Sequence, residues 1–308
     1  MKISLPYLLY TGDADATFGA KTAEGVLHWC PDQCVAQSAS PNGSLDLGIK
    51  RMSLEEAYAA GARTVLLGVT NRGGIYPAHW TDDLVKALEI GYDIASGLHD
   101  RLADQPALNE AAERHGRQLH DVRHWSGAPI PMGTGRNRTG KRALMIGTDC
   151  AVGKKFSALA VHRALVKQGA NATFRATGQT GVLIAGEGIA IDAVPADFIS
   201  GAVEMISPDN DESHWDVIEG QASVLHPSFA GVTLGLVHGA QPDAMILCHE
   251  PGRKTVRGLD ERPLPNITDT IRAHEIAAMV TNRNAKVVGV SLDTHRLPEA
   301  EASAAVDA

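Results

Sequence analysis

The chain of 308 residues lacks the features that mark several common classes of protein. Its four cysteines are too few and too scattered for a disulfide framework. Cys30 and Cys34 have the spacing of half a zinc site, but no matching second half follows, so we expect a structural role for the pair. An excess of basic charge is also missing. The net charge of -8 argues against a general nucleic-acid binder.

Long apolar runs are missing as well, so the sequence predicts no membrane span and no membrane partner. The start, MKISLPYLLYTGDADA, has no extended apolar stretch followed by a small-residue cleavage site. We therefore expect a soluble protein of the cytoplasm. The apolar content of 44% is that of a globular protein, and the length allows one large or two ordinary domains.

The first half alternates short apolar runs with amphipathic helical segments, which favours a parallel sheet with crossover helices. We predict a Rossmann-like N-terminal domain over 1–125. Paired glycines in the loop Asn71-Arg72-Gly73-Gly74 indicate a turn, with an anion-binding nest as the alternative. The expected elements are strands at 7–11, 64–70 and 118–123, and helices at 53–61, about 82–102 and about 106–115.

The segment SGAPIPMGTGRNRTG is rich in Pro, Gly and Arg and has neither helical nor strand periodicity. We predict a linker over 126–141, in which Arg136 and Arg138 are solvated. A second α/β domain is expected over 142–300, a three-layer fold with a mainly parallel sheet like that of P-loop NTPases. Its predicted strands lie at 142–147, 172–178, 215–219 and 285–293, with a helix over 154–169, and a flexible tail is expected over 301–308.

The run RALMIGTDCAVGKKFS has the layout of a phosphate-binding loop between a strand and a helix. In the G-x-x-x-x-G-K-[ST] frame, Thr148 replaces the first glycine and Lys155 replaces the hydroxyl residue that ligates Mg²⁺. The pattern therefore predicts phosphate binding without the usual metal ligand. The expected phosphate-binding residues are Gly147, Thr148, Cys150, Ala151, Val152, Gly153, Lys154 and Lys155.

The loop GTDCAVGK resembles that of dethiobiotin synthetase, but the likeness to that enzyme fades beyond the loop. Five motifs together resemble the D-glutamate N-acetyltransferase family, which has an N-terminal Rossmann-like domain and a C-terminal P-loop domain. The motifs are GTDCAVGK, ATGQTGVLIAGEG, DFISGAVE, EGQASVLHP and HGAQPDAMILCHEPGR. The resemblance implies transfer of an acetyl group from acetyl-CoA to an acidic amino acid. Coenzyme A carries phosphates that the loop would hold without cleaving.

Amide formation needs a base for the amine and donors for the thioester oxygen. Loops at the carboxyl edge of a parallel sheet gather at one place, which brings polar residues from several strands together. Asp149, Glu219 and His238 are the candidate bases, and Lys154 or the loop amides are the candidate oxyanion donors. Cys150 suggests an acetyl-cysteine route, but direct transfer does not require one. The predicted catalytic residues are Asp149, Lys154 and Glu219.

A dicarboxylate acceptor needs cations and hydrogen-bond donors, which indicates Arg175, Thr177, Gln179, Thr180 and Arg253. Two other functions remain open at this point. One is an ATP- and Mg²⁺-dependent ligase or kinase in which a carboxylate such as Asp149 recruits the metal. The other is a non-enzymatic nucleotide switch. On the first hypothesis we expect no metal, no nucleic-acid partner and assembly as a homo-oligomer.

Overall fold

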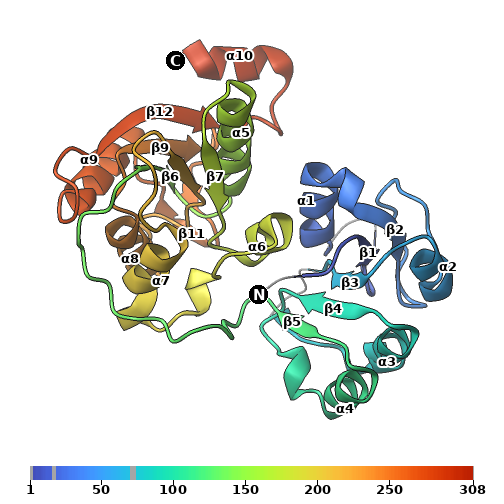
Figure 1. Cartoon of the computed structure of the whole chain (residues 1–308). Coiled ribbons are helices and arrows are strands. Elements are labelled where there is room, and N and C mark those ends of the chain that lie inside the picture. Colours follow the sequence, from blue (N-terminus) through green and yellow to red (C-terminus); the bar gives the residue numbers. More distant parts are fainter. Residues whose placement is uncertain (1–2, 16–18, 70–73, 308) are drawn as a thin grey trace. The chain divides into compact units, whose positions relative to one another are not determined.

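The computed structural model describes residues 3–15, 19–69 and 74–307. The chain divides into two compact units. The first comprises Met1–Gly127 together with Val182–Ala190, and the second comprises Ala128–Gly181 together with Ile191–Ala308. Each unit is described by itself (Figure 1). Among the described residues, no helix combines the length and the apolar character that a membrane crossing would need.

The first unit is a five-stranded parallel sheet with the strand order β2-β1-β3-β4-β5. Helix α1 lies on one face of the sheet, and α2, α3 and α4 lie on the other (Figure 1). The strands are β1 Tyr7–Tyr10, β2 Cys34–Ser38, β3 Thr64–Leu67, β4 Asp93–Ser96 and β5 Leu119–Asp121. The helices are α1 Lys21–Trp29, α2 Leu54–Ala59, α3 Thr81–Ile90 and α4 Pro106–His115, with short 3-10 turns at Pro31–Gln33, Ala78–Trp80 and Leu102–Asp104.

The predicted Rossmann-like architecture is confirmed, but the single helix expected over 82–102 is wrong. Helix α3 ends at Ile90 because Gly91 takes a left-handed conformation, with φ of +118°, and donates its amide to Ala87. The chain then forms the buried strand β4. Strand β2 was not expected at all. The turn predicted at Asn71–Gly73 lies outside the described residues.

The second unit also contains a five-stranded parallel sheet, in the order β12-β9-β6-β8-β7. Helix α5 covers one face, and α7, α8 and α9 cover the other (Figure 1). The strands are β6 Lys141–Gly147, β7 Ala172–Arg175, β8 Trp215–Ile218, β9 Ala244–His249 and β12 Lys286–Leu292, with an antiparallel hairpin of β10 Thr255–Val256 and β11 Leu259–Pro263. The helices are α5 Lys154–Lys167, α7 Ile199–Ile206, α8 Ala230–Ala240, α9 Ile267–Ala278 and α10 Glu299–Asp307, with 3-10 turns at Ile191–Ala193 and Ala196–Phe198. Helix α6, Gln179–Ala185, begins in this unit, and its residues from Val182 onward belong to the first.

Strand β6 occupies the centre of this sheet, so the loop that follows it emerges between the ends of β8 and β9. This is the place where open parallel sheets bind their ligands. The predicted P-loop architecture is confirmed. The segment expected as a flexible tail over 301–308 is helical as far as Asp307, although no residue of α10 is buried. Its four alanines and the two glutamates in its first turn favour a helix without tertiary packing.

The predicted linker is packed onto the second unit from Ala128 onward. Arg138, expected to be solvated, is only 7% exposed; it donates to the Ser207 hydroxyl at 2.8 Å and to the Gly239 carbonyl. Burial lowers the pKa of this guanidinium to about 10. The Glu204 carboxylate accepts the amides of Thr134 and Gly135. Only Arg136 fits the expectation of an exposed charge, and it pairs with Asp209 at 2.6 Å.

Candidate active site

The loop from Gly147 to Lys155 joins β6 to α5. Thr148 donates its amide to the carbonyl of Cys248 at 3.1 Å, which fixes the start of the loop to β9. Gly153 has φ of +89° and caps α5, a left-handed conformation that favours glycine. Within the described residues, the amides of Val152, Gly153, Lys154 and Lys155 donate no hydrogen bond. These successive unpaired amides at a helix N-terminus form a site suited to an anion.

Lys154 turns its side chain back into the loop. It is 6% exposed, and its Nζ donates to the Asp149 carbonyl at 2.6 Å. The glycines at the ends of β6 and β8 make room for it: a Cβ built at Gly147 would lie 2.8 Å from Nζ, and one built at Gly220 would lie 3.0 Å from Cδ. Burial lowers the pKa of Lys154. The ammonium is therefore held at the centre of the loop, where a phosphate would bring it a counter-charge.

Lys155 is half-buried, not solvated, and its Nζ lies 5.0 Å from the centre of the Phe156 ring. Burial lowers its pKa, while the charge of Glu219 acts in the opposite direction. The position that carries a Mg²⁺-ligating hydroxyl in nucleotide-cleaving loops thus carries a cation next to a carboxylate.

Asp149 is completely buried, and donors occupy both of its carboxylate oxygens. Oδ1 accepts the amide of Cys150 at 2.6 Å. Oδ2 accepts the amide of Arg257 at 2.7 Å and Nη1 of Arg253 at 2.9 Å. Through these three hydrogen bonds the buried carboxylate connects the loop to the segment that follows β9.

Arg253 acts as a clamp on the loop. Besides Asp149, its guanidinium contacts the Glu250 carboxylate, the carbonyl of Cys150 at 2.7 Å and the carbonyl of Ala151 at 2.8 Å. The planar guanidinium makes all of these contacts, and all of its partners lie within the chain. The sequence-based expectation that Arg253 binds substrate is not supported by this geometry.

His226 lies beside Asp149, and sequence reasoning missed it. The ring is 4% exposed, and Nδ1 accepts the amides of Ser228 at 3.1 Å and Phe229 at 3.3 Å. In the neutral ring the proton must then be on Nε2, which lies 3.5 Å from Asp149 Oδ1 and makes no hydrogen bond among the described residues. The signal for His226 in the sequence was its position in the motif EGQASVLHP, directly before a proline and the start of a helix.

Asp149, Cys150 and His226 bring their ligand atoms within 4.8 Å of one another, a grouping that would suit a metal ion. The hydrogen bonds favour another interpretation. Nε2 of His226 carries the proton in the neutral ring, so it offers no lone pair to a metal, and a guanidinium already lies on Asp149. Burial raises the pKa of the Cys150 thiol, which makes it a poor nucleophile.

Glu219 follows β8 and has a different environment. The side chain is 5% exposed, and Oε2 accepts the amides of Thr177 at 3.0 Å and Gly178 at 3.1 Å. Within the described residues Oε1 accepts no hydrogen bond. Burial raises the pKa of Glu219, and the charge of Lys155 opposes that shift. A side chain at Gly181 would collide with the carboxylate, so this glycine allows α6 to approach it.

Three further predicted residues follow β7 at this end of the sheet. The Thr177 hydroxyl donates to the Glu219 carbonyl at 2.8 Å and accepts Nε2 of Gln221 at 3.2 Å. Gln179 and Thr180 form the first turn of α6, directly after Gly178. The ends of β7 and β8 thus gather the polar residues that the sequence predicted there.

Arg175 and His238 have other environments. Arg175 donates from Nε to the buried carboxylate of Asp216 at 2.7 Å, and His214 lies 3.2 Å from the same oxygen. Arg175 thus already has an ion pair within the chain, and its contact with a substrate stays a prediction. His238 lies in the second half of α8, where burial lowers its pKa. His249 contacts the Thr148 hydroxyl through Nδ1 at 3.1 Å, and burial lowers its pKa too.

Comparison with known proteins agrees with this architecture. A family model described as "Domain of unknown function (DUF1611_N) Rossmann-like domain" matches residues 36–125, and the corresponding DUF1611_C P-loop domain matches residues 130–308. A crystal structure of a DUF1611 family protein from Anabaena variabilis ATCC 29413 has a TM-score of 0.86 and 30% identity, covering 99% of this chain and 92% of that one.

Two curated relatives carry a functional name. A D-glutamate N-acetyltransferase of Tritonibacter scottomollicae is 50% identical over 302 residues, which are 98% of this chain and 90% of that protein. A D-glutamate N-acetyltransferase of a Pseudoalteromonas species is 45% identical over 294 residues, 96% of this chain and 88% of that protein. These likenesses confirm the predicted N-acetyltransferase function and the acyltransferase class. The chain belongs to the DUF1611 family, whose members join a Rossmann-like domain to a P-loop domain.

Proposed function

We propose that this protein transfers the acetyl group of acetyl-CoA to the amine of D-glutamate. The names of the two full-length relatives support the acceptor. The observation that carries the donor is the loop itself, where four successive amides are unpaired among the described residues around a buried lysine. Such a loop suits the phosphates of coenzyme A. With Lys155 in place of a metal-ligating hydroxyl, it holds phosphates without the apparatus that cleaves them.

Glu219 is the general base of the proposed reaction. Its raised pKa, its uncommitted Oε1 and its position at the sheet edge suit it to accept a proton from the acceptor ammonium group. The freed amine then attacks the thioester carbon, the carbon–sulfur bond breaks, and the second proton of the nitrogen goes to the departing thiolate. Lys154 and the loop amides bind the phosphates of the donor in this proposal, so they do not serve the thioester oxygen.

Asp149 serves this reaction by shaping the loop. Its Oδ2 accepts from Arg253 and from the Arg257 amide and its Oδ1 from the Cys150 amide, so Asp149 is committed to contacts within the chain. The same occupancy argues against the ligase or kinase alternative, in which Asp149 would have to recruit Mg²⁺. We propose that no metal takes part. Gln179 and Thr180 are the donors proposed for the acceptor's carboxylates, whereas Thr177 gives its hydroxyl and its amide to Glu219 and holds that residue in place.

The test is a thiol-release assay with acetyl-CoA and a panel of D- and L-amino acids, run with and without EDTA. We expect release with D-glutamate that EDTA leaves unchanged. Lys154→Ala should abolish binding of acetyl-CoA, with Lys167→Ala at the other end of α5 as the matched control. If no acidic amino acid releases thiol and ATP is hydrolysed with Mg²⁺ instead, the proposed function is wrong.

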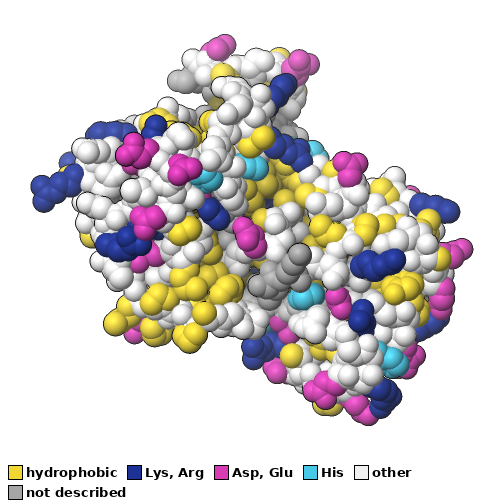
Figure 2. All heavy atoms as spheres, in the orientation of Figure 1, with side chains coloured by type: hydrophobic (Ala, Val, Ile, Leu, Met, Phe, Trp, Pro, Cys, Tyr) yellow, Lys and Arg dark blue, Asp and Glu magenta, His cyan; other side chains and the backbone are white. Residues whose placement is uncertain are grey.

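The setting of the reaction follows from its substrates. Acetyl-CoA is an intracellular metabolite, so we propose that the enzyme works in the cytoplasm on small molecules. Lysine and arginine side chains are interspersed with aspartate and glutamate on the face shown in Figure 2, which does not suit a nucleic-acid partner.

We also propose a homo-oligomer. Strand β12 is an edge strand, and Val288 and Val290 on it are 64% and 47% exposed. An exposed apolar edge of this kind is usually covered by another chain. Light scattering on wild type and on Val288→Lys tests this: a monomeric wild-type protein would contradict it.

A further inference from the structure

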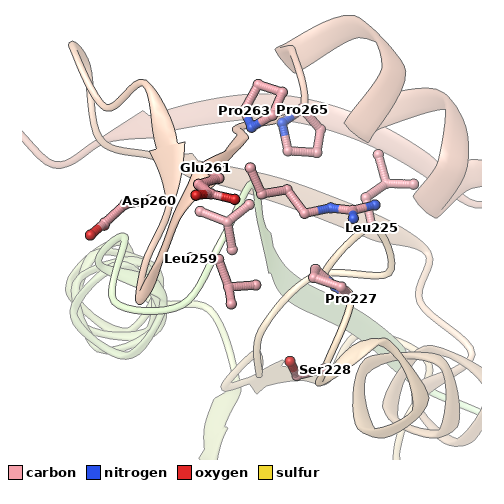
Figure 3. A pocket seen from close by; sticks show the side chains of 10 residues that line it. Leu225, Pro227, Ser228, Leu259, Asp260, Glu261, Pro263 and Pro265 are labelled. Atoms are coloured by element: carbon pink, nitrogen blue, oxygen red, sulfur yellow. The ribbon is translucent and has the colours of Figure 1, made fainter.

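An open cavity of about 990 Å³ lies in the second unit, between the turn before α8 and the β10–β11 hairpin (Figure 3). We call it the hairpin cavity. Its lining residues are Leu225, Pro227, Ser228, Val256, Leu259, Asp260, Glu261, Arg262, Pro263 and Pro265. No residue predicted from the sequence to bind a ligand belongs to this set.

Both walls of the hairpin cavity are attached to the phosphate loop through Asp149. On one wall, Leu225 and Pro227 flank His226, whose Nε2 lies 3.5 Å from Asp149 Oδ1. On the other wall, Val256 precedes Arg257, whose amide donates to Asp149 Oδ2 at 2.7 Å. One neighbour of each wall therefore contacts the same loop carboxylate, which ties the cavity to the loop.

The lining of the hairpin cavity is mainly apolar. Leu259 and Pro227 face the interior from opposite sides, whereas the Asp260 carboxylate points away (Figure 3). Leu225 and Leu259 remain 36% and 37% exposed, so apolar surface is left for a ligand to cover. Ser228 adds a hydroxyl that can pair with an amide.

The charge and the size of the cavity exclude the small acidic acceptor as its main occupant. Because Asp260 points away, Glu261 and Arg262 are the charged side chains left in the lining, and they offset each other, so the cavity has no net positive charge to attract a dicarboxylate or a phosphate. The volume is that of a site for a drug-sized ligand and far exceeds what one amino acid fills.

We infer that the hairpin cavity binds the pantetheine arm of the acyl donor, a long, uncharged chain of methylene groups and amides. The inference rests on the proposed use of acetyl-CoA. It divides donor recognition between two places: the loop from Gly147 to Lys155 binds the phosphates, and the cavity binds the uncharged arm that carries the thioester.

The test compares two ligands that share their phosphates and differ in the arm. Coenzyme A and 3′-phosphoadenosine 5′-diphosphate are titrated calorimetrically into wild type and into Leu259→Glu. We expect the variant to bind coenzyme A at least about tenfold more weakly, because the new charge opposes an apolar chain, and to bind the nucleotide as wild type does. The milder variant Leu225→Ala should shift affinity in the same direction.

The matched control is Leu234→Glu, which changes an equally exposed leucine on α8 outside the cavity, where Leu234 is 42% exposed. It should bind both ligands normally. If Leu259→Glu leaves coenzyme A affinity unchanged, or weakens both ligands equally, the inference is overturned while acetyl transfer by wild type keeps the proposed function intact. If wild type neither binds coenzyme A nor transfers acetyl, the proposed function itself fails.

Discussion

Asp149 and Glu219 are two buried carboxylates that follow neighbouring strands of one sheet, and their surroundings differ. Asp149 has a guanidinium and two amides on its oxygens, with an imidazole N–H 3.5 Å away. Glu219 has two amides on one oxygen, and burial raises its pKa. Burial alone therefore does not identify a base. A carboxylate whose oxygens are all occupied is part of the framework, whereas one with an uncommitted oxygen and a raised pKa is ready to take a proton.

The largest effect expected from this comparison is on the activity of Glu219→Gln. The amide can still accept from Thr177 and Gly178 but cannot take a proton. We expect kcat/KM for acetyl transfer to fall by about 10²–10⁴-fold with the fold retained. Glu275→Gln is the control, because Glu275 accepts the amide of Val287 at 3.0 Å in the same unit. More than about a tenth of wild-type activity in Glu219→Gln would remove Glu219 from this role.

Asp149→Asn should act on stability. It removes one of the two carboxylates that pair with the Arg253 guanidinium and leaves Glu250 as the other, so we expect a loss of about 1.5–3 kcal/mol of unfolding free energy. Urea unfolding of the variant measures this loss. A variant as stable as wild type but inactive would reverse the two roles and make Asp149 the candidate base.

The pH dependence provides a smaller and independent test. Because burial raises the pKa of Glu219 above its ordinary value of 4.5, kcat/KM should rise about tenfold per pH unit below the shifted pKa and level off above it. Glu219→Gln should lack this limb. The folded protein also binds this proton more tightly than the unfolded chain, so wild type should lose stability relative to the variant as the pH rises from 4.5 through the shifted pKa. A limb that survives in Glu219→Gln belongs to another group.

The smallest effects are expected at His226, where two substitutions separate the two ring nitrogens. In His226→Asn the side-chain oxygen can replace Nδ1 as acceptor for Ser228 and Phe229, but the donor facing Asp149 is lost. His226→Gln preserves the outer donor and loses the acceptor. Each should cost about 1 kcal/mol in unfolding free energy, with kcat within about threefold of wild type. A fall in kcat like that of Glu219→Gln would instead place His226 in the reaction.

Local signals in the sequence predict most of the fold. Helix α4 has the expected bounds because Pro106 starts it and Gly116 ends it in a left-handed conformation. The loop from Gly147 to Lys155 was found from its glycine, its lysine and the strand before it. Strand β2 and the end of α3 were missed, because a short amphipathic strand and a single glycine are weak signals beside a longer periodic run.

The site was predicted less completely, because the sequence shows which residues are polar but not which residues they contact. Arg175 and Arg253 lie at or after the ends of strands, as a substrate-binding arginine would. Only the structure shows that Arg175 forms an ion pair with Asp216 and that Arg253 forms one with Asp149. His226 is far from the loop in sequence, and nothing local reveals that its ring faces Asp149. Buried Arg138 was missed for the same reason, since its partners are a hydroxyl and carbonyls of distant helices.

The division of the chain has a consequence for how such a protein can be taken apart and inherited. Residues Val182–Ala190 cluster with the first unit, where the Tyr7 hydroxyl donates to the Leu183 carbonyl at 2.9 Å. A fragment that ends at Gly127 lacks this piece, and the complementary fragment carries it without its partners. One cut in the chain therefore cannot separate the two compact units whole, so a chimera joined at a single junction would take a piece of the first unit along with the second.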